Sequence, residues 1–178
     1  METSAVVSLS EYLQTTYHPD CEWIEGELKE RNVGELPHAS VQLFFTTYFA
    51  ARRRELGIRV YPELRVQVAA DRYRVPDVVV LRSGDPVEAI VRVPPLLCIE
   101  VLSRDDRASD LQEKIDDYLR MGVEVVWVVD PRLRTTFTVD GNGRQERVEE
   151  LTVPGTAIRI ARADVFAELD ELGWKELV

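Results

Sequence analysis

The sequence is poor in the residues and segments that mark secreted, zinc-stabilised or membrane proteins. Its two cysteines, Cys21 and Cys98, are too few for a disulfide scaffold or a four-ligand zinc site. No basic and apolar leader opens the chain, and no apolar run approaches the ~18 residues that a membrane span needs. We therefore expect a cytoplasmic protein that has no contact with a membrane and whose cysteines are reduced and structural.

Lysine is scarce as well, with only Lys29, Lys114 and Lys175, so arginine is the default cation of this chain. The net charge of −10 argues against a surface coated for nonspecific nucleic-acid binding, which depends on Lys and Arg contacts to phosphate. The charge is unevenly spread, because residues 52–82 contain eight arginines against four acids. A basic face can therefore coexist with an acidic exterior.

Length and hydrophobic periodicity predict one α/β (α+β) domain over residues 1–178, with a central mixed β-sheet flanked by helices. A helix that connects two strands of one sheet implies a crossover, and hence a mixed sheet. The last predicted helix lies between two such strands. Helices are predicted at 8–15, 37–56 and 106–121, a hairpin at 22–31, a meander of three strands at 58–68, 77–81 and 96–102, and further strands at 123–130 and 133–139.

Two carboxylates, Asp77 in RVPDVVVL and Glu100 in LLCIEVLS, interrupt runs of residues that are typical of strands buried on both faces. An unpaired buried charge costs several kcal/mol, so each carboxylate should be paired, metal-bound or at a strand edge. A divalent cation that bridges the two would satisfy both, and Mg²⁺ prefers one or two carboxylates together with water and substrate phosphate.

Lys114 lies on the helix that follows the Glu100 strand, in a stripe with Asp110 and Tyr118 at i, i+4 and i+8 spacing. An ammonium group beside two carboxylates could stabilise an attacking hydroxide or the charge that develops on a phosphate. We expect Asp110 to pair with Lys114 and so to position it. An ordinary exposed helix lysine is the alternative.

The ordered set of Pro76-Asp77, Glu100 and Lys114 resembles the PD-(D/E)XK signature of the restriction-endonuclease-like superfamily. More narrowly, the chain resembles the Uma-two family of restriction endonucleases from about Ser8 to Leu169. One departure from the superfamily pattern is that Leu102 stands where the in-strand lysine would fall, and Lys114 on the following helix is the matching position. The residues that carry the family resemblance are 22–28, His38, 74–80, 99–103, Asp110, Lys114, Tyr118, 122–123, 127–130, 154–155 and 163–166.

This resemblance implies a metal-dependent endonuclease that hydrolyses phosphodiester bonds, with DNA as its substrate. Asp77 and Glu100, with the backbone carbonyl of Val101, would hold Mg²⁺ or Mn²⁺. Glu27 and His38 would form an outer wall that supplies a second carboxylate ligand or a phosphate contact. They could equally be a solvent-facing hairpin residue and an exposed helix-start residue. Because cutting both strands usually requires two sites, we expect a homodimer.

Arg52, Arg53, Arg54 and Arg74 are candidate nucleic-acid contacts, although the first three could equally form a solvated helix end. Trp127 in a β-rich run is interpreted as core and not as a base-stacking platform.

Two rival functions stay open. The first is a catalytically degenerate domain that serves as a binding or regulatory module. The second is a structural oligomeric domain in which Asp77 and Glu100 pair with arginines. Nothing in the sequence names a recognition sequence or distinguishes DNA from RNA.

Overall fold

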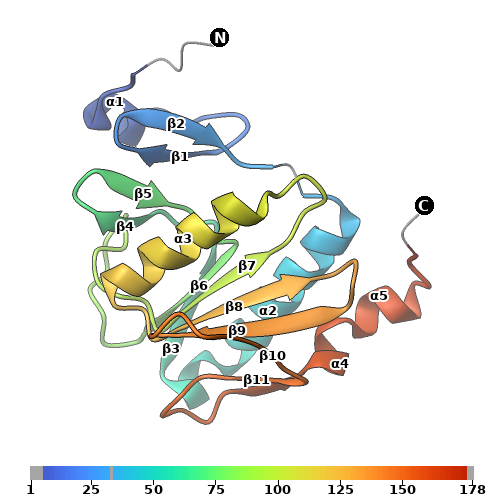
Figure 1. The fold of residues 1–178 in the computed structure, drawn as a ribbon. Helices are drawn as coiled ribbons and strands as arrows, with labels where there is room; N and C mark the ends of the chain where they lie inside the picture. The colour runs from blue at the N-terminus through green and yellow to red at the C-terminus, as the bar shows by residue number, and fades with distance from the viewer. Residues whose placement is uncertain (1–5, 33, 176–178) are drawn as a thin grey trace.

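The computed structural model describes residues 6–32 and 34–175, and its centre is a six-stranded sheet with helices on both faces (Figure 1). The strand order is β10-β9-β8-β7-β6-β3, in which β7 and β8 are parallel and the other neighbours antiparallel. The predicted mixed sheet is confirmed. The strands are β3 (Ile58–Pro62), β6 (Val78–Arg82), β7 (Leu97–Val101), β8 (Val125–Asp130), β9 (Thr135–Asp140) and β10 (Gln145–Arg147).

Two long helices cover opposite faces of this sheet. Helix α3 (Ala108–Met121) makes the crossover from β7 to β8 on one face, and α2 (Leu36–Leu56) lies on the other (Figure 1). Along β6, Val78 and Val80 belong to the core on the α2 side, whereas Val79 belongs to the core around α3. Burial on both faces explains why the central strands are continuous apolar runs and not alternating ones.

Helix α2 closely matches the predicted helix at 37–56. Pro37 lies in its first turn, where its missing N–H is not needed, and Gly57 ends it in the left-handed conformation at φ 63°. Helix α3 begins at Ala108, two residues later than the predicted start at residue 106. Gly122 ends it in the same left-handed conformation. Both glycines therefore stop their helices as the sequence predicts.

The N-terminal region forms a second, four-stranded sheet that the sequence did not predict. The segment 58–68 is not one strand, because the chain turns at Glu63 (φ 51°) and then forms a separate hairpin. That hairpin pairs with the predicted N-terminal hairpin in the order β2-β1-β5-β4 and not with the central sheet. The three-strand meander is therefore interrupted between β3 and β6. The four strands are β1 (Cys21–Ile24), β2 (Glu27–Glu30), β4 (Val66–Ala69) and β5 (Arg72–Arg74).

Smaller elements complete each end of the fold. Helix α1 (Leu9–Gln14) begins at Ser8, whose hydroxyl caps the N–H of Glu11, and its Tyr12 packs with aromatic residues of β1 and β5. The C-terminal elements pack on the α2 side of the core. They are β11 (Glu150–Thr152), β12 (Arg159–Ala161), α4 (Arg162–Val165) and α5 (Ala167–Glu171).

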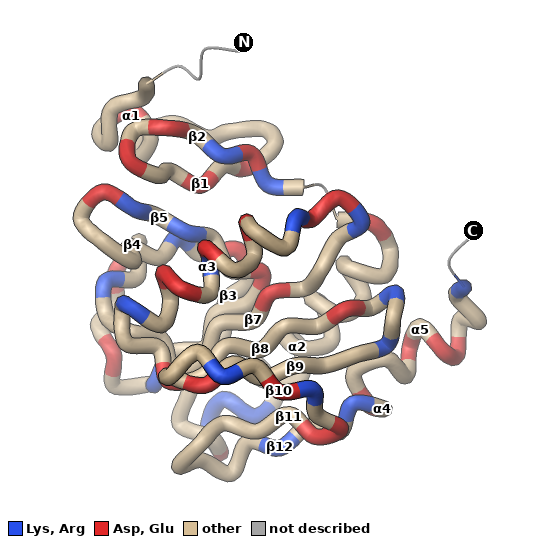
Figure 2. Tube along the Cα trace, in the orientation of Figure 1, with Lys and Arg blue, Asp and Glu red and all other residues tan. Residues whose placement is uncertain are grey.

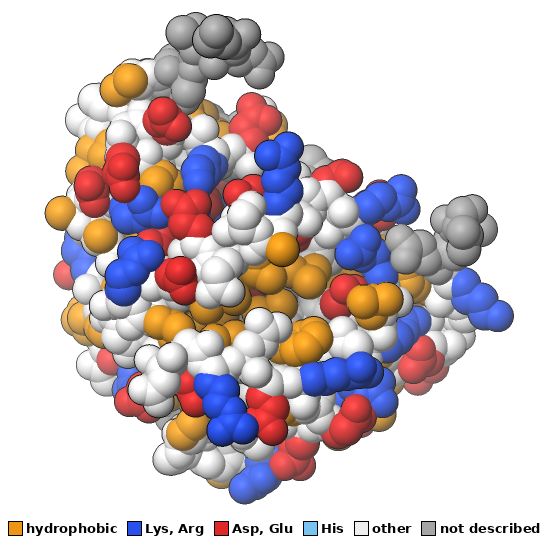
Figure 3. Space-filling view, in the orientation of Figure 1, with side chains coloured by type: hydrophobic (Ala, Val, Ile, Leu, Met, Phe, Trp, Pro, Cys, Tyr) orange, Lys and Arg blue, Asp and Glu red, His pale blue; other side chains and the backbone are white. Residues whose placement is uncertain are grey.

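On the α3 face, hydrophobic side chains reach the surface between α3 and strands β8 and β9 (Figure 3). Leu119 of α3 and Phe137 of β9 are partly buried and pack against the core around α3. Within residues 6–32 and 34–175, no helix has the length and apolar character to cross a membrane. Both cysteines are buried free thiols.

Trp127 is a core residue, because it is fully buried and packs between Phe45 and Phe49 of α2 at centroid separations of 5.8 and 6.1 Å. Its indole N–H donates to the Thr152 carbonyl at 3.2 Å. We expect Trp127→Phe to lower the free energy of unfolding by about 1–3 kcal/mol through lost volume and a lost hydrogen bond. Urea unfolding measures this loss, and an unchanged midpoint would contradict the packing role.

Candidate active site

The two predicted carboxylates lie side by side on adjacent strands. Strands β6 and β7 pair with Val78 opposite Ile99, and the same register continued by one residue places Asp77 opposite Glu100. Residues directly opposite each other on antiparallel strands have Cβ atoms about 4.5–5.5 Å apart on one face. By alternation with Val79 and Cys98, that face is the one covered by α3. Both carboxylates are only 4% exposed.

Hydrogen bonds fix the Asp77 carboxylate at both oxygens. Oδ2 accepts the backbone N–H of Val101 at 2.7 Å, while Oδ1 lies 2.6 Å from Nη2 of Arg31 and 3.3 Å from Nε2 of His38. Burial opposes ionisation of this group. The His38 hydrogen bond and charge, the Arg31 charge and the Val101 N–H outweigh that effect and hold the pKa of Asp77 below its usual range.

Glu100 receives its partners from α3, as the stripe of residues on that helix predicts. Tyr118 donates its hydroxyl to Oε1 at 2.6 Å, and Nζ of Lys114 lies 3.3 Å from Oε2. The crossover helix thus brings Lys114 to the carboxylate although Leu102 occupies the in-strand position. Burial raises the pKa of Glu100, and the charges of Asp77 and Glu22 add to that effect against the opposing Lys114.

A third carboxylate, Glu22 of β1, completes the site, and sequence reasoning did not identify it. It is 2% exposed, and its Oε1 lies 3.5 Å from Nζ of Lys114 and accepts the N–H of Val75 at 3.0 Å. Its Oε2 accepts from Arg74 at 2.8 Å. Lys114 therefore lies between carboxylates from both sheets, which ties the N-terminal sheet to the central one at this point.

A buried ion network behind the site connects β5 to α3. Arg74, 1% exposed, donates to Glu22 and, at 2.7 Å, to Asp117 of α3. Arg72 also donates to Asp117, at 3.0 Å, and Arg120 reaches the same carboxylate at 2.9 Å from the surface. These contacts hold α3 against the N-terminal sheet and so fix where Lys114 lies.

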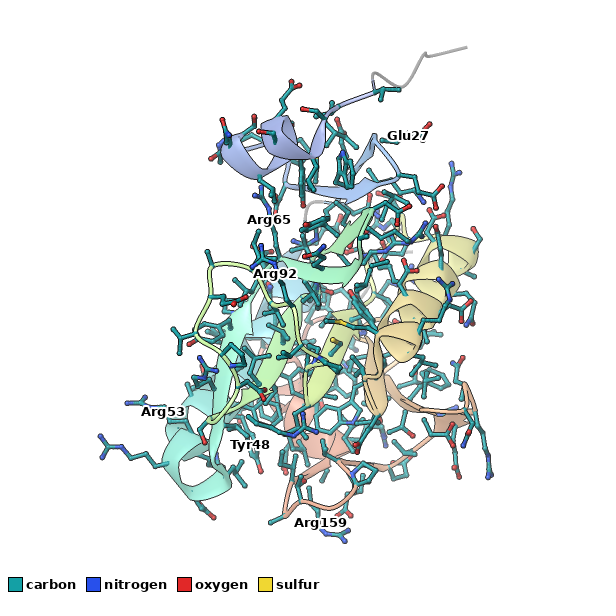
Figure 4. All side chains as sticks on the ribbon, turned by 90° about the vertical axis from the view of Figure 1, so that its left-hand side faces the viewer. Glu27, Tyr48, Arg53, Arg65, Arg92 and Arg159 are labelled. Carbon is teal, nitrogen blue, oxygen red and sulfur yellow. The ribbon has the colours of Figure 1, made fainter. Side chains whose placement is uncertain are left out.

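Of the three proposed accessory residues, Glu27 and Asp110 do not take the positions expected of them at the site, whereas His38 lies in the pocket beside Asp77. Glu27 is exposed at the outer edge of the hairpin and does not line the pocket, so it is not an outer wall of the site (Figure 4). Asp110 lines the pocket but makes no ion pair with Lys114 in the part of the chain that the structure describes. His38 is not an exposed helix start, because it is buried against Asp77.

Of the predicted nucleic-acid contacts, Arg74 lies at the site and the three arginines of α2 lie far from it. Arg74 lines the pocket but is only 1% exposed, and its guanidinium is paired with Glu22 and Asp117. Arg52, Arg53 and Arg54 lie at the far end of α2, about 21 Å or more along the helix axis from His38. The basic end of α2 appears at the foot of the molecule in Figure 2, and Figure 4 shows Arg53 pointing outward there.

The three carboxylates and Lys114 line a pocket of about 370 Å³ that also contains Arg31 and His38. No three His, Cys, Asp or Glu residues among 6–32 and 34–175 are grouped closely enough to hold a metal by themselves. Asp77 and Glu100 supply two carboxylates, which is what Mg²⁺ typically takes together with water and phosphate. Because the neighbouring carboxylates disfavour the charged form of Glu100, a cation between them would relieve their repulsion, so the donor set fits a divalent metal.

The fold is a mixed α/β architecture with a central sheet flanked by helices. A family model described as "Uma2: Putative restriction endonuclease" matches residues 9–166, and the chain belongs to that family. The family assignment supports a nuclease function and confirms the resemblance identified from the sequence.

The structure is similar to the crystal structure of a putative nuclease belonging to DUF820 from Anabaena variabilis. The TM-score is 0.80 at 23% identity, over 92% of this chain and 99% of that one. This likeness confirms the fold. A DrdV–DNA complex solved by electron cryomicroscopy matches with a TM-score of 0.42 and 16% identity, over 76% of this chain and 11% of that one. No curated protein matches the sequence.

The ion network behind the site yields a prediction with a matched control. Arg74→Met should lower the free energy of unfolding by about 3–5 kcal/mol. The reason is that Arg74 pairs with both Glu22 and Asp117, and the substitution removes this shared cation while both carboxylates stay buried. Arg120→Met removes a partner of the same Asp117, but its side chain is 65% exposed, so the loss should be within about 1 kcal/mol. Chemical denaturation compares the two, and equal losses would contradict the buried network.

Proposed function

We propose that this chain is a metal-dependent endonuclease that hydrolyses phosphodiester bonds of DNA. The observation that carries this proposal is the convergence of three buried carboxylates and one lysine on a single open pocket. Glu22 comes from β1, Asp77 immediately precedes β6, Glu100 comes from β7, and Lys114 comes from the crossover helix. A purely structural cluster would not need a pocket with room for a ligand, and this one has about 370 Å³.

Asp77, Glu100 and the carbonyl of Val101 are the groups that would hold Mg²⁺ or Mn²⁺. Such an ion, when bound, lowers the pKa of a coordinated water and neutralises charge on a phosphate. The Val101 N–H fixes Oδ2 of Asp77, and Tyr118 fixes Oε1 of Glu100. Each carboxylate therefore keeps its other oxygen, Oδ1 or Oε2, for the groups that face the pocket.

Lys114 supplies the positive charge for the reacting phosphate. Its ammonium lies 3.3 Å from Glu100 and 3.5 Å from Glu22, and its side chain is 21% exposed. Pre-oriented donors of this kind stabilise charge that develops in a transition state. His38 and Arg31, which line the same pocket, add two further cationic or hydrogen-bonding groups near Asp77.

The substrate and the assembly are also part of the proposal. The family description as a restriction endonuclease supports DNA as the substrate. One pocket of this size cuts one strand at a time, so we propose that two copies act together on a duplex. Light scattering of the purified protein, with and without DNA, tests the homodimer.

One specific observation favours the structural rival, in which the carboxylates pair with arginines. Asp77 does pair with Arg31 at 2.6 Å. Glu100, however, pairs with Lys114 and Tyr118 and with no arginine in the described residues, and Lys114 lines the pocket. The rival predicts that the wild-type protein binds no metal and that Asp77→Asn together with Glu100→Gln leaves its stability unharmed.

Cleavage by site variants tests the nuclease proposal. We expect Asp77→Asn to abolish nicking of supercoiled plasmid and to remove Mn²⁺ binding measured by calorimetry, because it removes a ligand charge. Lys114→Met should retain Mn²⁺ binding and slow nicking by about 10²–10³-fold, the usual cost of losing one pre-oriented donor. Single-stranded DNA and RNA of equal length serve as competing substrates.

Asp110→Asn is the matched control, because Asp110 lines the same pocket without touching Asp77, Glu100 or Lys114. Its nicking rate should stay within about threefold of wild type, the scatter typical of such context effects. Full nicking activity in Asp77→Asn would disprove the site, and Mn²⁺ binding without cleavage of any nucleic acid would favour the regulatory module.

A further inference from the structure

Arg31, at the end of the N-terminal hairpin, lines the pocket and is paired directly with Asp77. Its side chain is 11% exposed, and its Nη2 lies 2.6 Å from Oδ1 of Asp77. Its Nη1 faces two other carboxylates, at 3.3 Å from Glu63 and 4.0 Å from Asp20. The guanidinium therefore joins the buried carboxylate of the site to two carboxylates outside it.

The guanidinium occupies the oxygen that a metal would need. Oδ2 of Asp77 already accepts the Val101 N–H, so Oδ1 is the oxygen left for a cation. A metal on Oδ1 at about 2.0–2.1 Å would come into contact with Arg31, a like charge. The charges of Asp77, Glu100, Glu63 and Glu22 outweigh the opposing effect of burial and raise the pKa of Arg31, so it stays protonated beside any incoming ion.

Alternative acceptors for the guanidinium are already in place. Glu63 is 52% exposed and adopts φ 51°, an uncommon conformation for a residue other than glycine, in the turn between β3 and β4. Its N–H lies 3.3 Å from the Asp77 carbonyl, so the turn is tied to the site. The backbone N–H of Arg31 donates to the Asp20 carbonyl at 2.9 Å, which keeps the arginine near its second acceptor.

We propose that Arg31 and the metal ion exchange on Oδ1 of Asp77. In the absence of metal, Arg31 neutralises Asp77. When the metal binds, the guanidinium moves onto Glu63 and Asp20 and stays paired. This inference rests on the proposed metal site and adds to it a residue that sets metal affinity. His38 is the second group on this oxygen, with its Nε2 3.3 Å from Oδ1.

Mn²⁺ affinity of the full-length chain, measured by calorimetry without nucleic acid, tests the exchange. Arg31→Met removes the competing charge and should tighten Mn²⁺ binding by about tenfold, within the usual range of coupling between two ligands. Its thermal midpoint in EDTA should fall, because Asp77 then lacks its cation. Arg31→Lys, which keeps the charge on a side chain with a single ammonium group, should bind Mn²⁺ close to wild type and keeps the test open if Arg31→Met fails to fold.

Glu63→Gln isolates the acceptor to which the guanidinium moves. It should weaken Mn²⁺ binding several-fold in the wild-type background and have no effect beside Arg31→Met, because only a displaced Arg31 needs that carboxylate. Arg92→Met is the matched control, since Arg92 forms an exposed ion pair with Glu88 at 3.0 Å outside the pocket. It should change neither Mn²⁺ affinity nor the midpoint in EDTA.

The outcomes separate this exchange from the metal site itself. Equal or weaker Mn²⁺ binding by Arg31→Met than by wild type would overturn the exchange and leave the metal site standing. An equal effect of Glu63→Gln in both backgrounds would overturn the transfer to Glu63. Absence of Mn²⁺ binding in wild type and in every variant would overturn the proposed function, and the exchange with it.

Discussion

The structure depends on one electrostatic constraint, the burial of three carboxylates around a single pocket. Glu22, Asp77 and Glu100 are each almost fully buried, and each must be surrounded by donors or cations to remain in the fold. The chain supplies two cations from different elements, Arg31 and Lys114, and the buried Arg74 completes the set from β5. The same contacts that satisfy these charges bind the two sheets together, so the stability of the fold and the geometry of the site are not independent.

Each layer of the fold contributes a different part of the site. The central sheet fixes Asp77 and Glu100 through strand register, and α3 fixes Lys114 and Tyr118 through helical spacing. The N-terminal sheet then brings Glu22 and Arg31 to the pocket, held by an aromatic cluster of Tyr12, Trp23 and Tyr73. This cluster is stabilised by burial of aromatic surface and not by ion pairs. It can therefore hold the N-terminal hairpin in position without charged side chains that would compete for the carboxylates of the site.

Sequence reasoning could predict the parts of the site that local patterns encode. Asp77 and Glu100 stand out because they interrupt apolar runs. Lys114 stands out because the chain has only three lysines and because it lies four residues before Tyr118 on the same predicted helix. The role of Glu22 could not be separated from that of Glu27 in this way. All four residues of β1 are buried, so the strand has no alternation to show which side chain faces the site. The position of Arg31 in the pocket and the pairing of the β4–β5 hairpin with β1 depend on how the two sheets pack. Such packing joins residues that are distant in sequence, so it leaves no local sequence pattern.

The position of Lys114 on a helix and not on the strand changes what it can do. Burial disfavours its charged form, but Glu100, Glu22 and Asp77 outweigh that effect and raise the pKa of Lys114 above its usual range. A lysine in that state keeps its proton at any physiological pH and cannot accept one from water. Under the proposed function, Lys114 would therefore act as a fixed cation for an anionic group in the pocket. The same reasoning applies to Arg31, so neither of these two cations would accept the proton of an attacking water.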